Sequence, residues 1–124
     1  MSNIPLPHDH GQKIEERLSN LPDIEEFQNI AEQFRQLSDG SRLRLFWLLC
    51  HCEECVTNLS AMMQMSSPAL SHHLRLLKDA GLIVSRRSGK EVYYRAADTL
   101  TARTLHASME SLMAIACPTA ELHD

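Results

Sequence analysis

The chain has 124 residues and a formal net charge of −4, and 44% of its residues are hydrophobic and 23% are charged. This balance is typical of one globular domain and excludes a disordered chain or a histone-like polycation. No apolar run approaches the roughly 20 residues of a membrane-spanning helix, and the N-terminus lacks the basic and apolar regions of a signal peptide. We therefore expect a cytoplasmic protein with no membrane partner.

The first half of the chain predicts a flexible arm followed by four helices. Residues 1–11 hold two prolines and show no apolar periodicity, which is typical of an arm without regular structure. Apolar residues at helical spacing predict helices over 12–20, 22–37, 42–50 and 56–64. Asp39 or Ser41 is expected to cap the third of these helices. The inward side of that helix is predicted to consist of Leu43, Phe46, Leu49 and Cys50.

A fifth helix is predicted by the strongest capping signals in the chain. Ser67 suits the N-cap and Pro68 suits the first helical residue. The helix is expected to end at Ala80, because Gly81 readily adopts the left-handed conformation that stops a helix.

A β-hairpin and a last helix complete the expected fold. β-Prone runs over 82–86 and 91–95 flank the turn sequence Arg87-Ser88-Gly89-Lys90. The last helix is expected to begin after Asp98 or Thr99 and to extend to about Ala116. The predicted fold class is mainly α with a small β-hairpin, in the order α-α-α-α-α-β-β-α. We expect one domain over residues 12–117 and a tail over 118–124.

Charge is segregated along the chain. Residues 66–95 carry six basic and two acidic side chains, whereas the segments on both sides are net acidic. A localised basic segment is expected where one face of a protein meets phosphate groups. The alternative is a chance fluctuation on a solvated surface.

The basic segment has the pattern of a DNA-reading element. In the helix predicted over 68–80, one side is formed by leucines and the other by short polar and basic side chains, which is what insertion into a major groove requires. The hairpin is expected to present Arg86, Arg87 and Lys90 at its tip. A basic hairpin directly after such a helix is the layout of a winged helix, whose wing contacts the DNA backbone or the minor groove. The candidate DNA-binding residues are Ser66, Ser67, Ser71, His72, Arg75, Lys78, Arg86, Arg87 and Lys90. The alternative is that the polar face is only solvated and that Ser67 is only a cap.

Three motifs in this order resemble a known family. The stretch from Met65 to Ile83, MSSPALSHHLRLLKDAGLI, resembles the recognition segment of the ArsR/SmtB family of winged-helix repressors. So do LSDGSRLR at 37–44 and RSGKEVYYR at 87–95, and the resemblance covers about residues 24–116. It implies a homodimer built on the first and last helices, with two recognition helices in successive major grooves of operator DNA. It also implies a repressor that leaves its operator when an inducer, often a metal ion, binds.

The family's metal box is only partly present. The pattern Glu-Leu-Cys-Val-Cys-Asp-Leu appears as EECVTNL at 53–59, so that Cys55 matches the first cysteine while Thr57 and Asn58 replace the second cysteine and the acid. The resemblance implies that an N-terminal arm can reach this helix of the partner subunit. Thiolate and imidazole donors suit Zn²⁺ or another soft divalent ion. The candidate shell is therefore Cys52, Cys55, His8 and His10, and the alternative is that the cysteines are structural thiols and the arm binds nothing.

Other sites of the family are weaker matches. A second zinc site on the last helices would need a histidine where Leu100 stands, so we expect that site to be absent. His106 and Glu110, four residues apart on one helix face, are expected to form an exposed hydrogen-bonded pair, and the alternative is that they share a metal ion. Cys50 and Cys117 resemble the cysteine pair of family members that sense oxidants or persulfides, which makes a redox-sensing repressor the alternative.

No enzymatic site is predicted. Cys52 and Cys55 have the C-x-x-C spacing of redox enzymes, but the βαβ unit in which a thioredoxin-like motif operates is not predicted here. The competing hypothesis to a repressor is a metal-binding or protein-interaction module that kept the winged-helix fold without a DNA role.

Overall fold

The structure is a computed structural model and describes residues 5–114. The chain divides into two units, one ending at Ala31 and one beginning at Glu32, and each is described by itself. Among the described residues, no helix is both long enough and apolar enough to cross a membrane.

The N-terminal unit contains α1 (Ile14–Leu18) and the beginning of α2 (Ile24–Gln36). These helices confirm the two predicted over 12–20 and 22–37, within shorter bounds. The first turn of α2 carries acidic residues, which complement the positive end of the helix dipole. The apolar side of α2 is exposed at Ile24, Phe27, Ile30 and Phe34.

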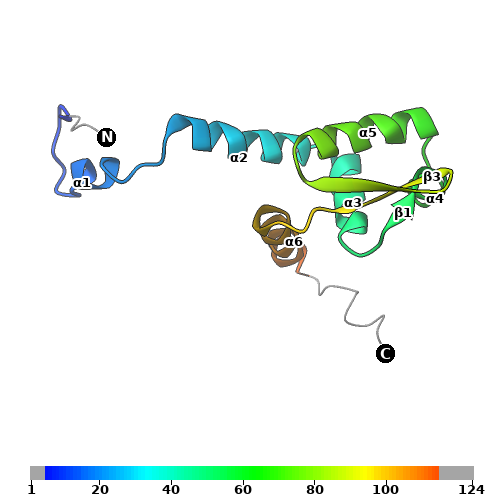
Figure 1. The fold of residues 1–124 in the computed structure, drawn as a ribbon. Coiled ribbons are helices and arrows are strands. Elements are labelled where there is room, and N and C mark those ends of the chain that lie inside the picture. The colour runs from blue at the N-terminus through cyan, green and yellow to red at the C-terminus, as the bar shows by residue number, and fades with distance from the viewer. Residues whose placement is uncertain (1–4, 115–124) are drawn as a thin grey trace. The chain divides into compact units, whose positions relative to one another are not determined.

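The unit from Glu32 onward holds a helical core and a small sheet (Figure 1). Its elements are α3 (Gly40–Leu49), β1 (Glu54–Cys55), α4 (Val56–Met63), α5 (Ser67–Asp79), β2 (Ile83–Ser88), β3 (Glu91–Ala96) and α6 (Leu100–Met113). The sheet is antiparallel in the order β1-β3-β2, with Tyr93 of β3 opposite Cys55 on one side and opposite Arg86 on the other. The predicted fold class is confirmed, and β1 is an addition that the sequence patterns did not predict.

The core forms where α3, α4, α5 and the start of β2 meet. Its fully buried side chains are Leu45, Phe46, Leu49, Leu59, Leu70, Leu74, Leu77, Leu82 and Ile83. Each such side chain stabilises the fold by about 1.5–3 kcal/mol relative to leaving it exposed. The predicted inward side of α3 is partly wrong, because α3 packs against both α5 and β3. As a result Leu45 is buried, whereas Leu43 and Cys50 are only half-buried.

The predicted cap of the fifth helix is wrong by one residue. The N-cap of α5 is Ser66, whose backbone is extended and whose hydroxyl oxygen accepts a hydrogen bond from the backbone N–H of Ala69 at 3.3 Å. Ser67 is the first helical residue and Pro68 the second, so the predicted start of the helix at Pro68 is also wrong by one residue. After the helix, Gly81 has a φ of +77° and confirms the left-handed stop.

The N-caps of α3 and α6 are each one of the two residues predicted for them. Asp39 caps α3 by accepting a hydrogen bond from the backbone N–H of Arg42 at 3.0 Å. Thr99 caps α6 through the backbone N–H of Ala102 at 3.1 Å. In the described part of the chain α6 ends at Met113, and the predicted end at Ala116, Cys117 and the tail over 118–124 lie outside the described residues.

Candidate nucleic-acid interface and thiol loop

Helix α5 presents a polar face because its opposite face is buried. Leu70, Leu74 and Leu77 are at most 1% exposed. Ser71, His72, Arg75, Lys78 and Asp79 are exposed on the other side. The leucines thus fix the helix on the core, and the exposed side chains, apart from Asp79, are among those predicted to meet DNA.

The exposed side chains of α5 are partly ordered by contacts with one another. The Arg75 guanidinium lies 2.9 Å from Nδ1 of His72, one helical turn away. The Lys78 ammonium donates a hydrogen bond to the Ser85 hydroxyl at 2.8 Å, which ties the end of α5 to β2. The helix and the hairpin are therefore joined at the surface that the sequence assigns to DNA.

A second polar contact joins α5 to α3. Nη1 of Arg42 lies 3.3 Å from Nδ1 of His73, and Nε of Arg42 donates to the carbonyl oxygen of Gln36 at 2.9 Å. Burial lowers the pKa of His73, the positive charge of Arg42 lowers it further, and Asp39 opposes both. The neutral ring can therefore accept the hydrogen bond of Arg42, and His73 is turned toward this contact while His72 is exposed.

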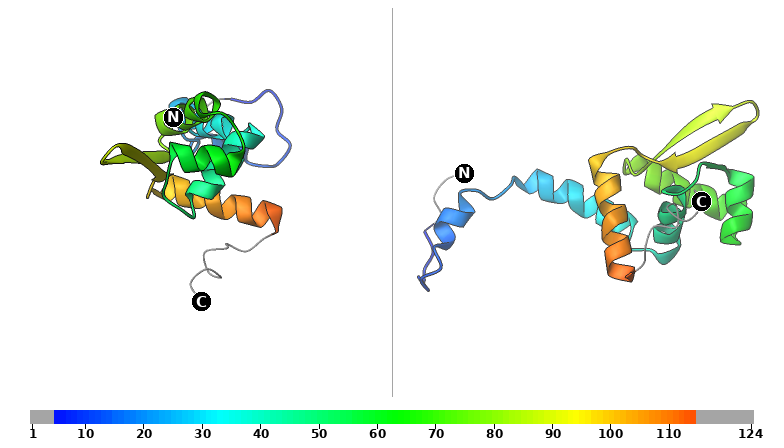
Figure 2. Two further views of the ribbon diagram at one scale, coloured as in Figure 1. Left: turned by 90° about the vertical axis from the view of Figure 1, so that its right-hand side faces the viewer. Right: turned by 90° about the horizontal axis from the view of Figure 1, so that it is seen from below.

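The β2–β3 hairpin extends away from the helices (Figure 2), and its basic residues are not equivalent. Arg87 and Lys90 are exposed in the outer part of the hairpin. Arg86 was predicted at the tip as well, and this placement is wrong, because it lies in β2 opposite Tyr93. Its guanidinium donates two hydrogen bonds to Glu53, at 2.9 and 2.7 Å, and lies 4.9 Å from the centre of the Tyr93 ring.

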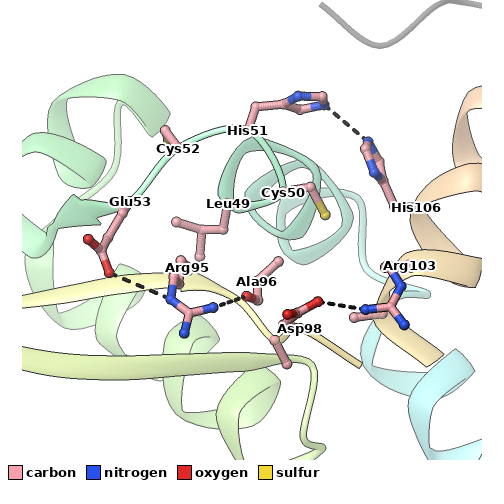
Figure 3. A pocket seen from close by; sticks show the side chains of 12 residues that line it. Leu49, Cys50, His51, Cys52, Glu53, Arg95, Ala96, Asp98, Arg103 and His106 are labelled. Atoms are coloured by element: carbon pink, nitrogen blue, oxygen red, sulfur yellow. Dashed lines mark hydrogen bonds and ion pairs between the residues drawn. The ribbon is translucent and has the colours of Figure 1, made fainter. Parts of the chain in front are cut away.

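Glu53 connects the hairpin to the loop that carries the cysteines. Besides Arg86 it contacts Nε of Arg95 at 3.7 Å (Figure 3). The hydrogen bond from Arg86, assisted by the charges of both arginines, lowers the pKa of Glu53. We call residues 50–55 the thiol loop. Through Glu53 this loop binds an arginine on each strand of the hairpin, Arg86 on β2 and Arg95 on β3.

The cysteines of the thiol loop differ in environment. Cys55 is buried in β1, whereas Cys50 and Cys52 are half-buried. The Cys52 thiol donates a hydrogen bond to the carbonyl oxygen of Leu48 at 3.3 Å. Burial, and then the negative charge of Glu54, raises the pKa of Cys52. A metal ion at Cys52 would therefore have to displace a firmly held proton.

The residues of the predicted metal shell belong to two different units of the chain. His8 and His10 lie in the N-terminal unit, with ring centroids 6.0 Å apart, whereas Cys52 and Cys55 belong to the other unit. Among residues 5–114, no three histidine, cysteine, aspartate or glutamate side chains are placed to hold a metal ion. The donor types still suit a soft divalent ion, and the shell stays a prediction in which the arm belongs to the partner subunit.

The structure adds one group that the sequence did not predict. His51 and His106 approach each other with their Nε2 atoms 3.1 Å apart, and Glu110 lies 3.6 Å from the same atom of His106. The expected contact of His106 with Glu110 is present, but the two side chains are only 19% and 21% exposed, so the pair is not on the exposed surface as expected. His51 was missed because 55 positions separate it from His106. The two histidines and Cys50 are among the residues that line a pocket of about 440 Å³ (Figure 3).

A leucine-backed polar helix followed by a basic hairpin defines a winged-helix DNA-binding protein. Residues 39–85 match the profile of bacterial regulatory proteins of the arsR family. A transcriptional repressor SmtB homolog from Synechocystis sp. is 39% identical over 89 residues, which are 72% of this chain and 67% of that protein. The chain belongs to the ArsR family of bacterial regulatory proteins. These proteins are transcriptional regulators and not enzymes, as predicted.

Two further comparisons give the extent of the likeness. The cadmium resistance regulatory protein CadC homolog of Staphylococcus aureus is 39% identical over 67 residues, and the match covers 53% of this chain and 55% of that protein. The chain thus spans about half the length of this relative. A solution structure of a homodimeric winged helix-turn-helix DNA-binding domain from Mycobacterium bovis has a TM-score of 0.66 and 27% identity, covering 75% of this chain and 87% of that domain.

Proposed function

We propose that the protein is a sequence-specific transcriptional repressor that binds operator DNA as a homodimer. We further propose that a metal ion or a thiol-reactive species releases it. The observation that carries this proposal is the construction of α5, in which three buried leucines hold a face of exposed polar side chains outward. A cytoplasmic location follows from this role.

In this proposal the residues of the interface divide by task. Ser71, His72 and Arg75, on the exposed face of α5, read base edges in the major groove. The N-terminal turn of α5 at Ser66 and Ser67 offers backbone N–H groups and the positive helix end to a phosphate.

The remaining basic residues contact the DNA backbone in this proposal. Lys78 binds a phosphate from the end of α5, and Arg87 and Lys90 do so from the hairpin. Nε and Nη2 of Arg86 bind Glu53. In the proposal Arg86 therefore orients the hairpin, and only its Nη1 is directed to the DNA.

The homodimer is supported by apolar side chains that one chain leaves exposed. On α2, Phe27 and Phe34 are 49% and 59% exposed, and on α6, Leu112 and Met113 are 86% and 47% exposed. Exposed apolar patches of this kind mark interaction surfaces. A second copy of the chain is the occupant we propose, because the homodimeric relative of known structure covers 75% of this chain and a two-fold interface joins the same patch of both subunits.

For the inducer, we propose Cys52 and Cys55 with His8 and His10 of the partner subunit as the shell for Zn²⁺ or another soft divalent ion. Thiolates and imidazoles would supply strong, soft coordination there. Within the chain, the thiol loop is coupled to the hairpin by Glu53 and by the pairing of β1 with β3. A change in the loop therefore reaches the hairpin through contacts that one chain already makes.

Fluorescence anisotropy with the full chain tests the proposal. The protein should bind labelled DNA from upstream of its own gene at least about 1,000-fold more tightly than scrambled DNA at the same salt concentration. Equal affinity for both DNAs would contradict sequence-specific repression. No binding to either DNA, together with retained metal binding, would instead favour the metal-binding module without a DNA role.

A further inference from the structure

Two histidines from distant parts of the chain face each other at the surface of the C-terminal unit. His51 follows the C-terminal end of α3, and His106 lies within α6 (Figure 3). Their Nε2 atoms are 3.1 Å apart, and the rings meet edge to face with centroids 4.8 Å apart. Both residues are half-buried.

The separation of the two nitrogens is close to that of two ligands on one metal ion. Zinc–nitrogen bonds of about 2.0–2.1 Å at a tetrahedral angle place two imidazole nitrogens about 3.3 Å apart. The observed 3.1 Å also fits a single N–H···N hydrogen bond, so the distance alone does not decide.

A carboxylate next to the two nitrogens favours the metal-binding interpretation. Oε1 of Glu110 lies 3.6 Å from Nε2 of His106, and the side chains of His106 and Glu110 are only 19% and 21% exposed. Three groups able to bind a metal ion therefore meet near one ring nitrogen. Two imidazoles and one carboxylate form a known open zinc site, in which solvent takes the fourth position.

The surroundings of His51 suit a metal ligand. The Trp47 ring packs against it with centroids 4.5 Å apart, which restricts the orientation of the imidazole. Burial, and then the proximity of His106, lowers the pKa of His51, while the charge of Glu110 opposes both, so that the neutral form of the ring is favoured. Neutral imidazole is the form that binds metal ions.

We propose that His51, His106 and Glu110 form a binding site for Zn²⁺ or a similar divalent transition-metal ion within one subunit. The described residues do not yet surround one point as three ligands. Binding requires the two nitrogens to separate by a few tenths of an ångström and the Glu110 side chain to rotate toward His51. The bound ion would join α6 to the end of α3, and the site is separate from the shell proposed at Cys52 and Cys55.

Zinc binding is best tested by NMR on the full chain, prepared metal-free and labelled with ¹⁵N at the histidine rings. In a Cys55→Ser background, which removes the proposed cysteine shell and serves as the parent of this test, adding Zn²⁺ should shift the Nε2 resonances of His51 and His106 together, with one ion per chain, while the exposed ring of His72 stays unchanged. Competition with a chromophoric chelator then gives affinities. Removal of a ligand in His106→Gln should weaken Zn²⁺ binding by at least about 100-fold, and Glu110→Gln by about 10-fold or more. The matched control His72→Gln should keep the parent affinity.

Two results would overturn the site. One is His106→Gln and Glu110→Gln binding Zn²⁺ as tightly as the parent. The other is a Zn²⁺ signal that disappears in Cys55→Ser while the His51 and His106 resonances never move, which would assign the ion to the cysteine shell. If His106→Gln fails to fold, the Zn²⁺ affinity of Glu110→Gln still tests the site, because that variant changes one half-buried side chain conservatively. The test measures Zn²⁺ binding and not operator affinity. It can therefore be decided even if the protein proves not to be a repressor.

Discussion

Helix α5 and the thiol loop are held in place by different means. α5 rests on Leu70, Leu74 and Leu77, which are at most 1% exposed, and it has a cap at each end. The edge of the thiol loop is held by polar contacts. Examples are the hydrogen bond from the Cys52 thiol to the Leu48 carbonyl oxygen and the hydrogen bonds that Glu53 accepts from Arg86 of the hairpin. Helix α5 is therefore fixed by apolar burial, whereas the edge of the thiol loop is held by polar contacts, which is the difference that the proposed repressor requires between a DNA-reading helix and an inducer site.

Removing one leucine beneath α5 should have the largest effect on stability. Leu74→Ala is expected to lower the free energy of unfolding by about 2–5 kcal/mol, because it deletes a fully buried side chain and leaves a cavity. Urea unfolding at one fixed protein concentration measures the change. The matched control Leu100→Ala, at a leucine that is 74% exposed, should stay within about 0.5 kcal/mol of the parent. Equal losses for both variants would contradict this assignment of the core.

The next largest effect separates reading from docking on DNA. Arg75→Ala should weaken operator binding by about 5- to 150-fold, or roughly 1–3 kcal/mol, with little change on scrambled DNA. Lys90→Ala should instead weaken binding to both DNAs similarly and reduce the slope of log affinity against log salt by about 1. Anisotropy titrations at several salt concentrations measure both effects. The same loss for both variants on all DNA would show that the helix and the hairpin do not divide the work in this way.

The thiol loop should matter for release and not for reading. Cys55→Ser is expected to bind the operator but to lose inducer-driven release, whose typical size is about 5- to 150-fold in affinity, or roughly 1–3 kcal/mol. The measurement is a titration of the protein–operator complex with Zn²⁺, Cd²⁺, arsenite and a persulfide donor. Cys50→Ser is the control for a metal inducer and should behave as the parent.

Other outcomes of that titration identify the inducer. A metal response that survives Cys55→Ser unchanged would remove this residue from the shell. A response to the persulfide donor alone, lost in Cys117→Ser, would favour the redox alternative.

The sequence predicted what depends on near neighbours. The leucines of α5 recur every three or four residues, and the stop at Gly81 follows from one residue type. The cap was misplaced by one residue because Ser66 and Ser67 are adjacent and chemically identical. Such a choice depends on the backbone angle of each serine, which the sequence does not contain.

Features that depend on distant pairing were missed. The two-residue strand β1 exists only because it pairs with β3, and its residues have no alternating pattern long enough to detect. The contact that holds Arg86 in β2 was missed because its partner Glu53 lies 33 positions earlier in the chain. His51 and His106 are farther apart still. The candidate sensing sites fall into this class, and for that reason their residues were predicted less completely than those of α5.

The smallest expected effect tests the contact between α5 and α3 through its pH dependence. Burial lowers the pKa of His73 below its usual value of about 6.5, so the unfolded chain binds more protons than the folded chain as the pH falls through that region. The stabilisation from neutral His73, which accepts the hydrogen bond of Arg42, is thus complete above about pH 6.5 and is lost as the pH falls through the lowered pKa. Urea unfolding of the parent and of His73→Gln at pH 7.5 and 5.5, with a chelator present, measures the difference. The parent should lose more stability on acidification than His73→Gln, because only the parent carries the His73 ring. His51, whose pKa is also lowered, contributes to both proteins equally and cancels in the comparison. Equal losses would show that the pKa of His73 is the same in the folded and the unfolded chain, and the joint between the two helices would then be insensitive to pH.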